Sequence, residues 1–157
     1  MIEPGHPHYM QLALREAQKS ADQDEVPVGA IIVHGGQVIG KAHNQTELLK
    51  DPTAHAEMIA ITQAAAALGD WRLEDTTLYV TKEPCPMCAG AIILARIPTV
   101  VFGVIDPLRG GAVSVFTILN HPNLNHRPTV ISGILEAECR EMLQSFFKAK
   151  RKKKDRS

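Results

Sequence analysis

Residues 77–95, TLYVTKEPCPMCAGAIILA, combine two secondary-structure signals with a pair of cysteines. The short run Thr77–Thr81 is rich in β-branched and aromatic residues, which favours a strand. The apolar run Cys88–Ala95 is typical of a helix, and a further β-rich run, Thr99–Val104, comes soon after it. The segment therefore predicts a strand, a helix and a second strand in succession.

The N-terminal half extends this alternation of strands and helices. Apolar positions at helical spacing predict a helix over Tyr9–Ala21. Val28–His34 and Gln37–His43 predict two strands joined by a tight turn at Gly35-Gly36. The alanine-rich segment His55–Leu68 predicts a second helix, because a glycine follows its last apolar residue.

The C-terminal part predicts one more strand and one more helix. Thr129–Ser132 is the fifth candidate strand, and Ile134–Lys150 has the spacing of an amphipathic helix. Gly103–Val115 is expected to form a loop over one edge of the sheet. A hairpin followed by strands that alternate with helices predicts an α/β fold, a three-layer α/β/α sandwich with a central mixed five-stranded sheet.

Length and composition limit the domain count and the compartment. A chain of 157 residues with 45% hydrophobic residues suits one domain, which we expect over residues 1–150. No stretch approaches the ~20 apolar residues of a bilayer span, and the first residues do not resemble a secretory signal. Three cysteines, two of them spaced as a metal pair, suit a reducing compartment. We therefore expect a cytoplasmic protein with free thiols and no membrane segment.

The formal net charge of zero conceals a basic C-terminus. Residues 148–156 carry seven Lys or Arg side chains and one Asp, so this segment has a charge of +6 and the remainder −6. Such a block attracts phosphate groups in a salt-dependent way, as nucleic-acid-binding tails do. The alternative is a solubilising tail, and in either case we expect residues 151–157 to be disordered.

Four residues form a candidate metal site. Cys85 and Cys88 are separated by two residues near a predicted helix start, where the positive end of the helix dipole helps to keep thiols deprotonated. His55, at the start of another predicted helix, supplies a third ligand. Three protein ligands leave the fourth tetrahedral position of a zinc ion to water, which is typical of catalytic sites. Glu57, two residues after His55, is then a candidate general acid and base beside that water.

A purely structural zinc site is the alternative reading of this pattern. It requires a fourth ligand, and the candidates are the remaining histidines and Cys139. Cys139 lies within the last amphipathic helix and is expected to be a core thiol. His121 and His126 belong to a loop rich in Pro and Asn, and we expect them to be surface or hydrogen-bonding groups.

The complete set of motifs resembles the bacterial tRNA-specific adenosine deaminases of the cytidine deaminase-like superfamily. The resemblance runs from about Tyr9 to Arg151. It is carried by Glu25-Val26-Pro27-Val28-Gly29-Ala30, His43-Asn44, Asp51-Pro52-Thr53-Ala54-His55-Ala56-Glu57, Trp71-Arg72-Leu73, Thr77-Leu78-Tyr79-Val80-Thr81, Met87-Cys88-Ala89-Gly90-Ala91, Arg96-Ile97, Asn125-His126-Arg127 and Phe146-Phe147-Lys148.

The resemblance implies an activity, a substrate and a set of site residues. The activity is hydrolytic deamination of the wobble adenosine of a tRNA anticodon stem-loop to inosine, with water as co-substrate, by a homodimer holding one Zn²⁺ per subunit. His55, Cys85 and Cys88 are implied as zinc ligands and Glu57 as the proton carrier. The implied substrate contacts are Asn44 and Val28 at the nucleoside, Asp106 at the neighbouring nucleotides, and Phe146 or Phe147 at the RNA-facing end of the pocket.

The sequence also departs from the family pattern. Leu108 stands in place of a usual lysine, and Val113 in place of a usual glycine before Ser114. Pro86 between the cysteines is common in guanine and cytosine deaminases. Deamination of a free base or nucleoside, such as guanine, cytosine or cytidine, therefore remains an alternative, as does a non-catalytic RNA-binding module stabilised by zinc.

Overall fold

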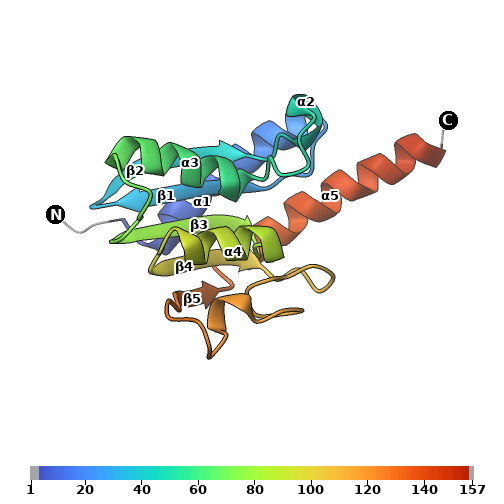
Figure 1. Ribbon diagram of the computed structural model, residues 1–157. Helices are drawn as coiled ribbons and strands as arrows, with labels where there is room; N and C mark the ends of the chain where they lie inside the picture. The colour runs from blue at the N-terminus through green and yellow to red at the C-terminus, as the bar shows by residue number, and fades with distance from the viewer. Residues whose placement is uncertain (1–3, 156–157) are drawn as a thin grey trace.

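The computed structural model describes residues 4–155, and the chain forms one mixed sheet with flanking helices (Figure 1). In chain order the elements are α1 (His6–Asp22), β1 (Gly29–His34), β2 (Gln37–His43), α2 (Thr46–Leu49), α3 (Ala56–Leu68), β3 (Thr76–Lys82), α4 (Pro86–Leu94), β4 (Thr99–Val104), the 3-10 helix η1 (Ile118–Asn120), β5 (Thr129–Ser132) and α5 (Glu136–Asp155).

The sheet has the strand order β2-β1-β3-β4-β5. β1 pairs antiparallel with both β2 and β3, whereas β3, β4 and β5 run parallel. The parallel pairing of β3 with β4 follows from α4, which crosses over between them. The five strands and their mixed directions confirm the predicted α/β fold class.

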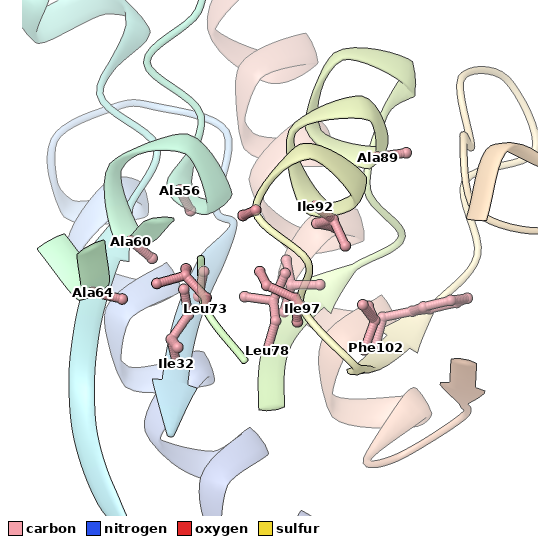
Figure 2. Packing of buried hydrophobic residues seen from close by; sticks show 14 of the residues in the cluster. Ile32, Ala56, Ala60, Ala64, Leu73, Leu78, Ala89, Ile92, Ile97 and Phe102 are labelled. Carbon is pink, nitrogen blue, oxygen red and sulfur yellow. The ribbon is translucent and has the colours of Figure 1, made fainter. Parts of the chain in front are cut away.

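Helices cover both faces of the sheet. α3 and α4 lie on the face towards the viewer in Figure 1, and α1 lies behind the sheet. Small and branched apolar side chains pack between the sheet and the helices α3 and α4. Figure 2 labels Ala60, Ile92 and Phe102 among them. A second cluster, which includes Met10, Tyr79 and Cys139, fills the space between the sheet, α1 and the start of α5. The two clusters fill the spaces between three layers, helices, sheet and helices, as the sequence predicted.

One edge of the sheet gathers the segments that build the site. The register places the last residue of β2 opposite the first residue of β1, and Lys82 at the end of β3 beside Val104 at the end of β4. The segments before β1 and after β2, β3 and β4 therefore all meet at this edge. Ligands of open α/β sheets typically bind beyond such carboxyl ends of parallel strands.

The structure adds two short elements to the predicted ones and lengthens others, α5 among them. α2 and η1 were not predicted, and α5 continues to Asp155, beyond the predicted end at Lys150. The sequence predicted a disordered tail over 151–157, whereas residues 151–155 are helical and residues 156–157 lie outside the described residues. Lys and Arg are good helix formers and are favoured at the negative end of the helix dipole, which explains the longer helix.

None of the helices within residues 4–155 has both the length and the apolar character needed to cross a bilayer. Most of α5 beyond its first turns projects away from the sheet in Figure 1, and its side chains from 148 to 155 are exposed.

Candidate metal centre and nucleotide pocket

His55, Cys85 and Cys88 are brought together by two helix starts. His55 is the N-cap residue of α3, Cys85 is the N-cap residue of α4, and Cys88 lies in the first turn of α4. The distance from His55 Nδ1 to the Sγ atom is 3.5 Å for each cysteine. The three ligand atoms all lie within 4.8 Å of one another. The predicted ligand set is thus assembled from segments 30 residues apart.

The spacing of these atoms fits a tetrahedral zinc ion. Bond lengths of ~2.1 Å to nitrogen and ~2.3 Å to sulfur, at a tetrahedral angle, separate nitrogen from sulfur by about 3.6 Å, close to the distances in the structure. In the part of the chain that the structure describes, no fourth Cys, His, Asp or Glu joins the group. The described residues therefore offer three ligands, as an open catalytic site does.

The other candidate ligands lie elsewhere. Cys139 is buried, and burial is the main reason that its pKa is raised to about 12. Its Sγ atom packs so closely on Gly103 that a Cβ atom at position 103 would lie within 2.3 Å of it. His126 Nε2 lies 2.8 Å from the carbonyl oxygen of Ile97. The predictions of a core thiol and of a hydrogen-bonding histidine are confirmed.

The local environment favours a thiolate at the ligand group. The pKa of Cys85 is lowered to about 4, first because its sulfur hydrogen-bonds with the Cys88 thiol and also because the His55 ring lies beside it. The pKa of Cys88 is raised by the same contact and by burial. One thiolate is therefore available to attract a cation before any metal binds.

Glu57 lies in the first turn of α3, where its side chain is buried with 4% exposure and lines the same cavity as His55 and Cys85. Burial is the largest influence on this carboxyl group and raises its pKa. A carboxyl group with a raised pKa is suited to taking up and returning a proton near neutral pH. Glu57 is thus positioned as the sequence predicted, next to the ligand group.

A cavity of about 620 Å³ opens above the ligand group. This volume lies within the usual range for small-molecule sites, ~300–1,000 Å³. Four of the residues for which the resemblance implied substrate contacts line it, namely Val28, Asn44, Asp106 and Phe147. Phe146 is not among the lining residues; its ring packs edge-to-face on that of Phe147 at 5.4 Å.

Asn44 is held in one orientation. Its Oδ1 atom accepts a hydrogen bond of 2.8 Å from the backbone N–H of Ala56, the first residue of α3. With the oxygen engaged, the amide NH₂ group remains as the donor end of a side chain that lines the cavity. Asn44 can therefore donate hydrogen bonds to a ring nitrogen or hydroxyl group of a ligand.

Glu83 is a residue that the sequence reasoning missed. Its carboxylate is buried with 3% exposure and accepts hydrogen bonds from the backbone N–H groups of Asp106, Ala112, Val113 and Ser114 at 2.8–3.1 Å. The hydroxyl group of Ser114 adds a fifth, at 2.6 Å. Glu83 therefore fixes the loop after β4 to the segment that carries Cys85.

The ionisation of Glu83 reflects these contacts. Burial alone raises the pKa of a carboxyl group, but the hydrogen bonds from Ser114, Val113 and Asp106 outweigh it and lower the pKa below the ordinary value of 4.5. The corresponding contribution to stability is present above pH 4.5 and is lost as the pH falls through the lower folded-state pKa. Glu83 is thus a carboxylate at neutral pH.

Replacing Glu83 by Gln is expected to loosen this loop. The variant loses the charge and places an NH₂ group against backbone donors, which costs about 2 kcal/mol, or roughly 4–8 °C in Tm. Amide hydrogen exchange at Ala112–Ser114 should accelerate.

The matched control is Glu25→Gln, because the buried Glu25 carboxylate accepts hydrogen bonds from the backbone N–H groups of Glu47 and Leu48, at 2.7 and 3.2 Å. That variant should accelerate exchange at 47–48 only, and unchanged exchange at 112–114 in Glu83→Gln would contradict the assignment.

Comparison with known proteins agrees with this geometry. The family model of MafB19-like deaminases matches residues 5–151. A tRNA-specific adenosine deaminase of Bacillus subtilis (strain 168) is 50% identical over 146 residues, which are 93% of this chain and 91% of that protein. A solved structure from a study of A-to-I editing by tRNA:A34 deaminases superposes with a TM-score of 0.83 and 46% identity, covering 87% of this chain and 99% of the other.

A guanine deaminase of Bacillus subtilis is a more distant structural neighbour. It superposes with a TM-score of 0.62 and 38% identity over 65% of this chain and 66% of its own. Taken with the three-ligand group, the buried Glu57 and the matches over most of the chain, these similarities show that the chain belongs to the MafB19-like deaminase family, among the relatives of the tRNA-specific adenosine deaminases.

Proposed function

We propose that this protein is a zinc-dependent hydrolytic deaminase that converts the wobble adenosine of a tRNA anticodon to inosine. The observation that carries the chemistry is the open group of His55, Cys85 and Cys88 beside the buried Glu57. The substrate is supported by the similarity, at about half of all positions, to tRNA-specific adenosine deaminases.

Metal binding and proton transfer are carried out by different residues. His55, Cys85 and Cys88 would hold the zinc ion, which when bound makes a water molecule acidic at neutral pH. Glu57 accepts a proton from the attacking water, delivers it to N1 of the adenine and assists departure of the amino group from C6. The overall reaction consumes one water and releases one ammonia.

The cavity walls hold the base for this attack. Asn44 donates its amide hydrogens to the nucleoside, in the orientation fixed by Ala56. Val28 packs against the flat face of the base, and Phe147 lies at the side of the cavity that α5 covers. A nucleotide of an RNA loop can be extruded into such a pocket at a cost of a few kcal/mol.

The experiment that tests the function compares three substrates. The protein is incubated with an anticodon stem-loop that carries a wobble adenosine and, in parallel, with guanine and with cytidine. Inosine in the stem-loop, without ammonia release from the other two, is the expected result. Ammonia from guanine alone would instead support the second candidate, and RNA binding without ammonia would indicate a non-catalytic module.

The second candidate, deamination of a free base, is favoured by two observations. Pro86 lies between the two cysteines, as in the guanine and cytosine deaminases that the sequence resembles at this position, and it is exposed. The structural similarity to a guanine deaminase extends over 65% of the chain. A free base is small enough to need no contacts outside the cavity.

Removing residues 148–157 is expected to separate the two candidates. If the substrate is tRNA, KM should rise at least several-fold at moderate salt, because the exposed Lys and Arg side chains of α5 no longer attract phosphates. Deamination of a free base should not change. A variant that keeps α5 but carries Gln at positions 150, 152, 153 and 154 should reproduce the effect. An unchanged KM for the stem-loop in both variants would exclude the basic segment from substrate binding.

We also propose a homodimer that acts in the cytoplasm, where the proposed substrate is found. Large apolar side chains are exposed on α4 and on the loop beside it: Leu94 at 70%, Phe116 at 51%, Val115 at 43% and Val113 at 41%. α4 packs against η1, which follows this loop. Exposed apolar groups of this kind mark interaction surfaces, and light scattering should give twice the mass of the chain.

A further inference from the structure

Lys82 is a cation in the wall of the cavity that the proposed chemistry does not use. It is the last residue of β3, and it lines the same cavity as His55 and Glu57. Its Nζ atom lies 3.1 Å from Oδ2 of Asp106, on the loop after β4. The side chain of Lys82 is 27% exposed and that of Asp106 is 11% exposed. The ion pair therefore lies at the inner surface of the cavity and remains accessible from it.

Asp106 holds this lysine from a fixed position. Its Oδ1 atom accepts the backbone N–H groups of Leu108 and Arg109, at 3.0 and 3.1 Å. Its own backbone N–H is bound by Glu83 at 3.0 Å. The carboxylate is thus anchored through two hydrogen bonds besides the ion pair, and a third holds the backbone of Asp106, so Lys82 is tethered to a rigid partner.

The tether leaves part of the ammonium group unused. An ammonium group has three N–H donors, and the contact with Asp106 accounts for one of them. Within residues 4–155, Asp106 is the only ion-pair partner described for Lys82. The remaining donors can therefore serve an anion that enters the cavity.

An RNA substrate brings such an anion. Each ribose in a strand carries a phosphate on either side, so a base that reaches His55 and Glu57 draws a phosphate towards the cavity wall. Without Lys82, this phosphate would face the carboxylate of Asp106. Leu108, at the rim, is 81% exposed and apolar, so it offers no charge of its own.

We propose that Lys82, tethered by Asp106, binds a backbone phosphate adjacent to the adenosine that enters the cavity. The inference rests on the proposed function and assigns a substrate contact to it. Lys82 cancels the charge of Asp106 and donates a charge-assisted hydrogen bond to the phosphate. Because the phosphate does not react, the contact strengthens binding of the RNA and leaves the chemical step alone.

The test measures how RNA binding by Lys82→Met depends on salt. We expect KM and the dissociation constant for the anticodon stem-loop to rise about tenfold, with kcat and zinc content unchanged. The slope of log Kd against log salt should decrease by about 0.7, which corresponds to one phosphate contact on a single strand. A merely structural lysine would not change this slope.

Three further variants sharpen the result. Lys41→Met removes an exposed lysine from β2 and should leave the slope and KM unchanged. In the Lys82→Met background, Asp106→Asn should restore part of the affinity by removing the uncompensated carboxylate. Leu108→Lys in the same background should restore both affinity and slope, because it returns a cation to the rim.

Two outcomes overturn the proposal. One is a salt slope in Lys82→Met equal to that of the unaltered protein, and the other is a loss of kcat with an unchanged Kd. Failure of the proposed function is a separate result, namely the absence of inosine with the unaltered protein. Binding of the stem-loop is measured by fluorescence anisotropy, so the role of Lys82 is tested whether or not turnover occurs.

Discussion

Replacing Glu57 by Gln is expected to lower kcat about a thousandfold, while the protein still binds one zinc ion. General acid–base catalysis by one side chain contributes ~10²–10⁴ in rate, and the amide cannot carry the proton from water to the base. Glu57 is not one of the three grouped ligands, so the metal should remain. Turnover is measured as inosine or ammonia release, and zinc by elemental analysis.

The matched control for this variant is Glu16→Gln. Glu16 and Glu57 have the same exposure, 4%, but Glu16 lies in α1 and pairs with Lys19. This substitution should leave kcat within about twofold. Retention of full turnover by Glu57→Gln, with zinc bound, would exclude Glu57 as the proton carrier.

Replacing Cys85 by Ser is expected to remove the metal and, with it, all measurable turnover. The variant offers a hydroxyl group that is a poor zinc ligand at neutral pH, and two remaining ligands hold the ion weakly. At a free zinc concentration a thousand times the dissociation constant, bound zinc adds about 4 kcal/mol to the free energy of unfolding. Its loss should therefore lower Tm by roughly 10 °C. Zinc content and the thermal transition are the measurements.

Cys139→Ser serves as the control for thiol loss. Cys139 does not belong to the ligand group. Its side chain is buried against Gly103, in the cluster between the sheet, α1 and α5. That variant should keep one zinc ion and its activity, with a modest loss of stability. If Cys85→Ser also kept its zinc, the proposed ligand set would be wrong.

The sequence was most informative where structure follows from neighbouring residues. The bounds predicted for the strands Gln37–His43, Thr99–Val104 and Thr129–Ser132 match β2, β4 and β5. Local spacing likewise placed His55 and Glu57 at one helix start, and Cys85 and Cys88 at another. Local spacing was sufficient in these cases.

Contacts between distant segments could not be predicted in this way. α2 is only four residues long, and it is held by Glu25, more than 20 residues before it. Lys82 and Glu83 contact a loop that begins more than 20 residues after them. Glu25 and Glu83 bind backbone N–H groups, which almost every residue type carries, so the sequence does not indicate these contacts. The sequence also could not distinguish Phe146 from Phe147, because this choice depends on the rotation of α5 about its axis.

Asp106 lines the cavity, and its partners within the protein could not be read from the sequence. The resemblance implied a contact with nucleotides beside the target. In the structure its carboxylate contacts Lys82 and the backbone of 108 and 109, and hydrogen bonds from Leu108 and the Lys82 charge lower its pKa despite burial. Any nucleotide near Asp106 therefore meets an ion pair.

The hydrogen bonds of Glu83 have a consequence for how specificity can change in this protein. Four of the five come from main-chain N–H groups, and only the fifth, from the Ser114 hydroxyl group, depends on a side chain of the loop. Val113 illustrates this, because it donates its N–H at 2.8 Å, has no positive φ, and leaves 41% of its surface exposed where the family pattern has glycine. Leu108 and Arg109 project from a backbone anchored on either side. Selection, or directed evolution, can therefore vary the side chains at the mouth of the pocket without rebuilding the metal centre beneath it.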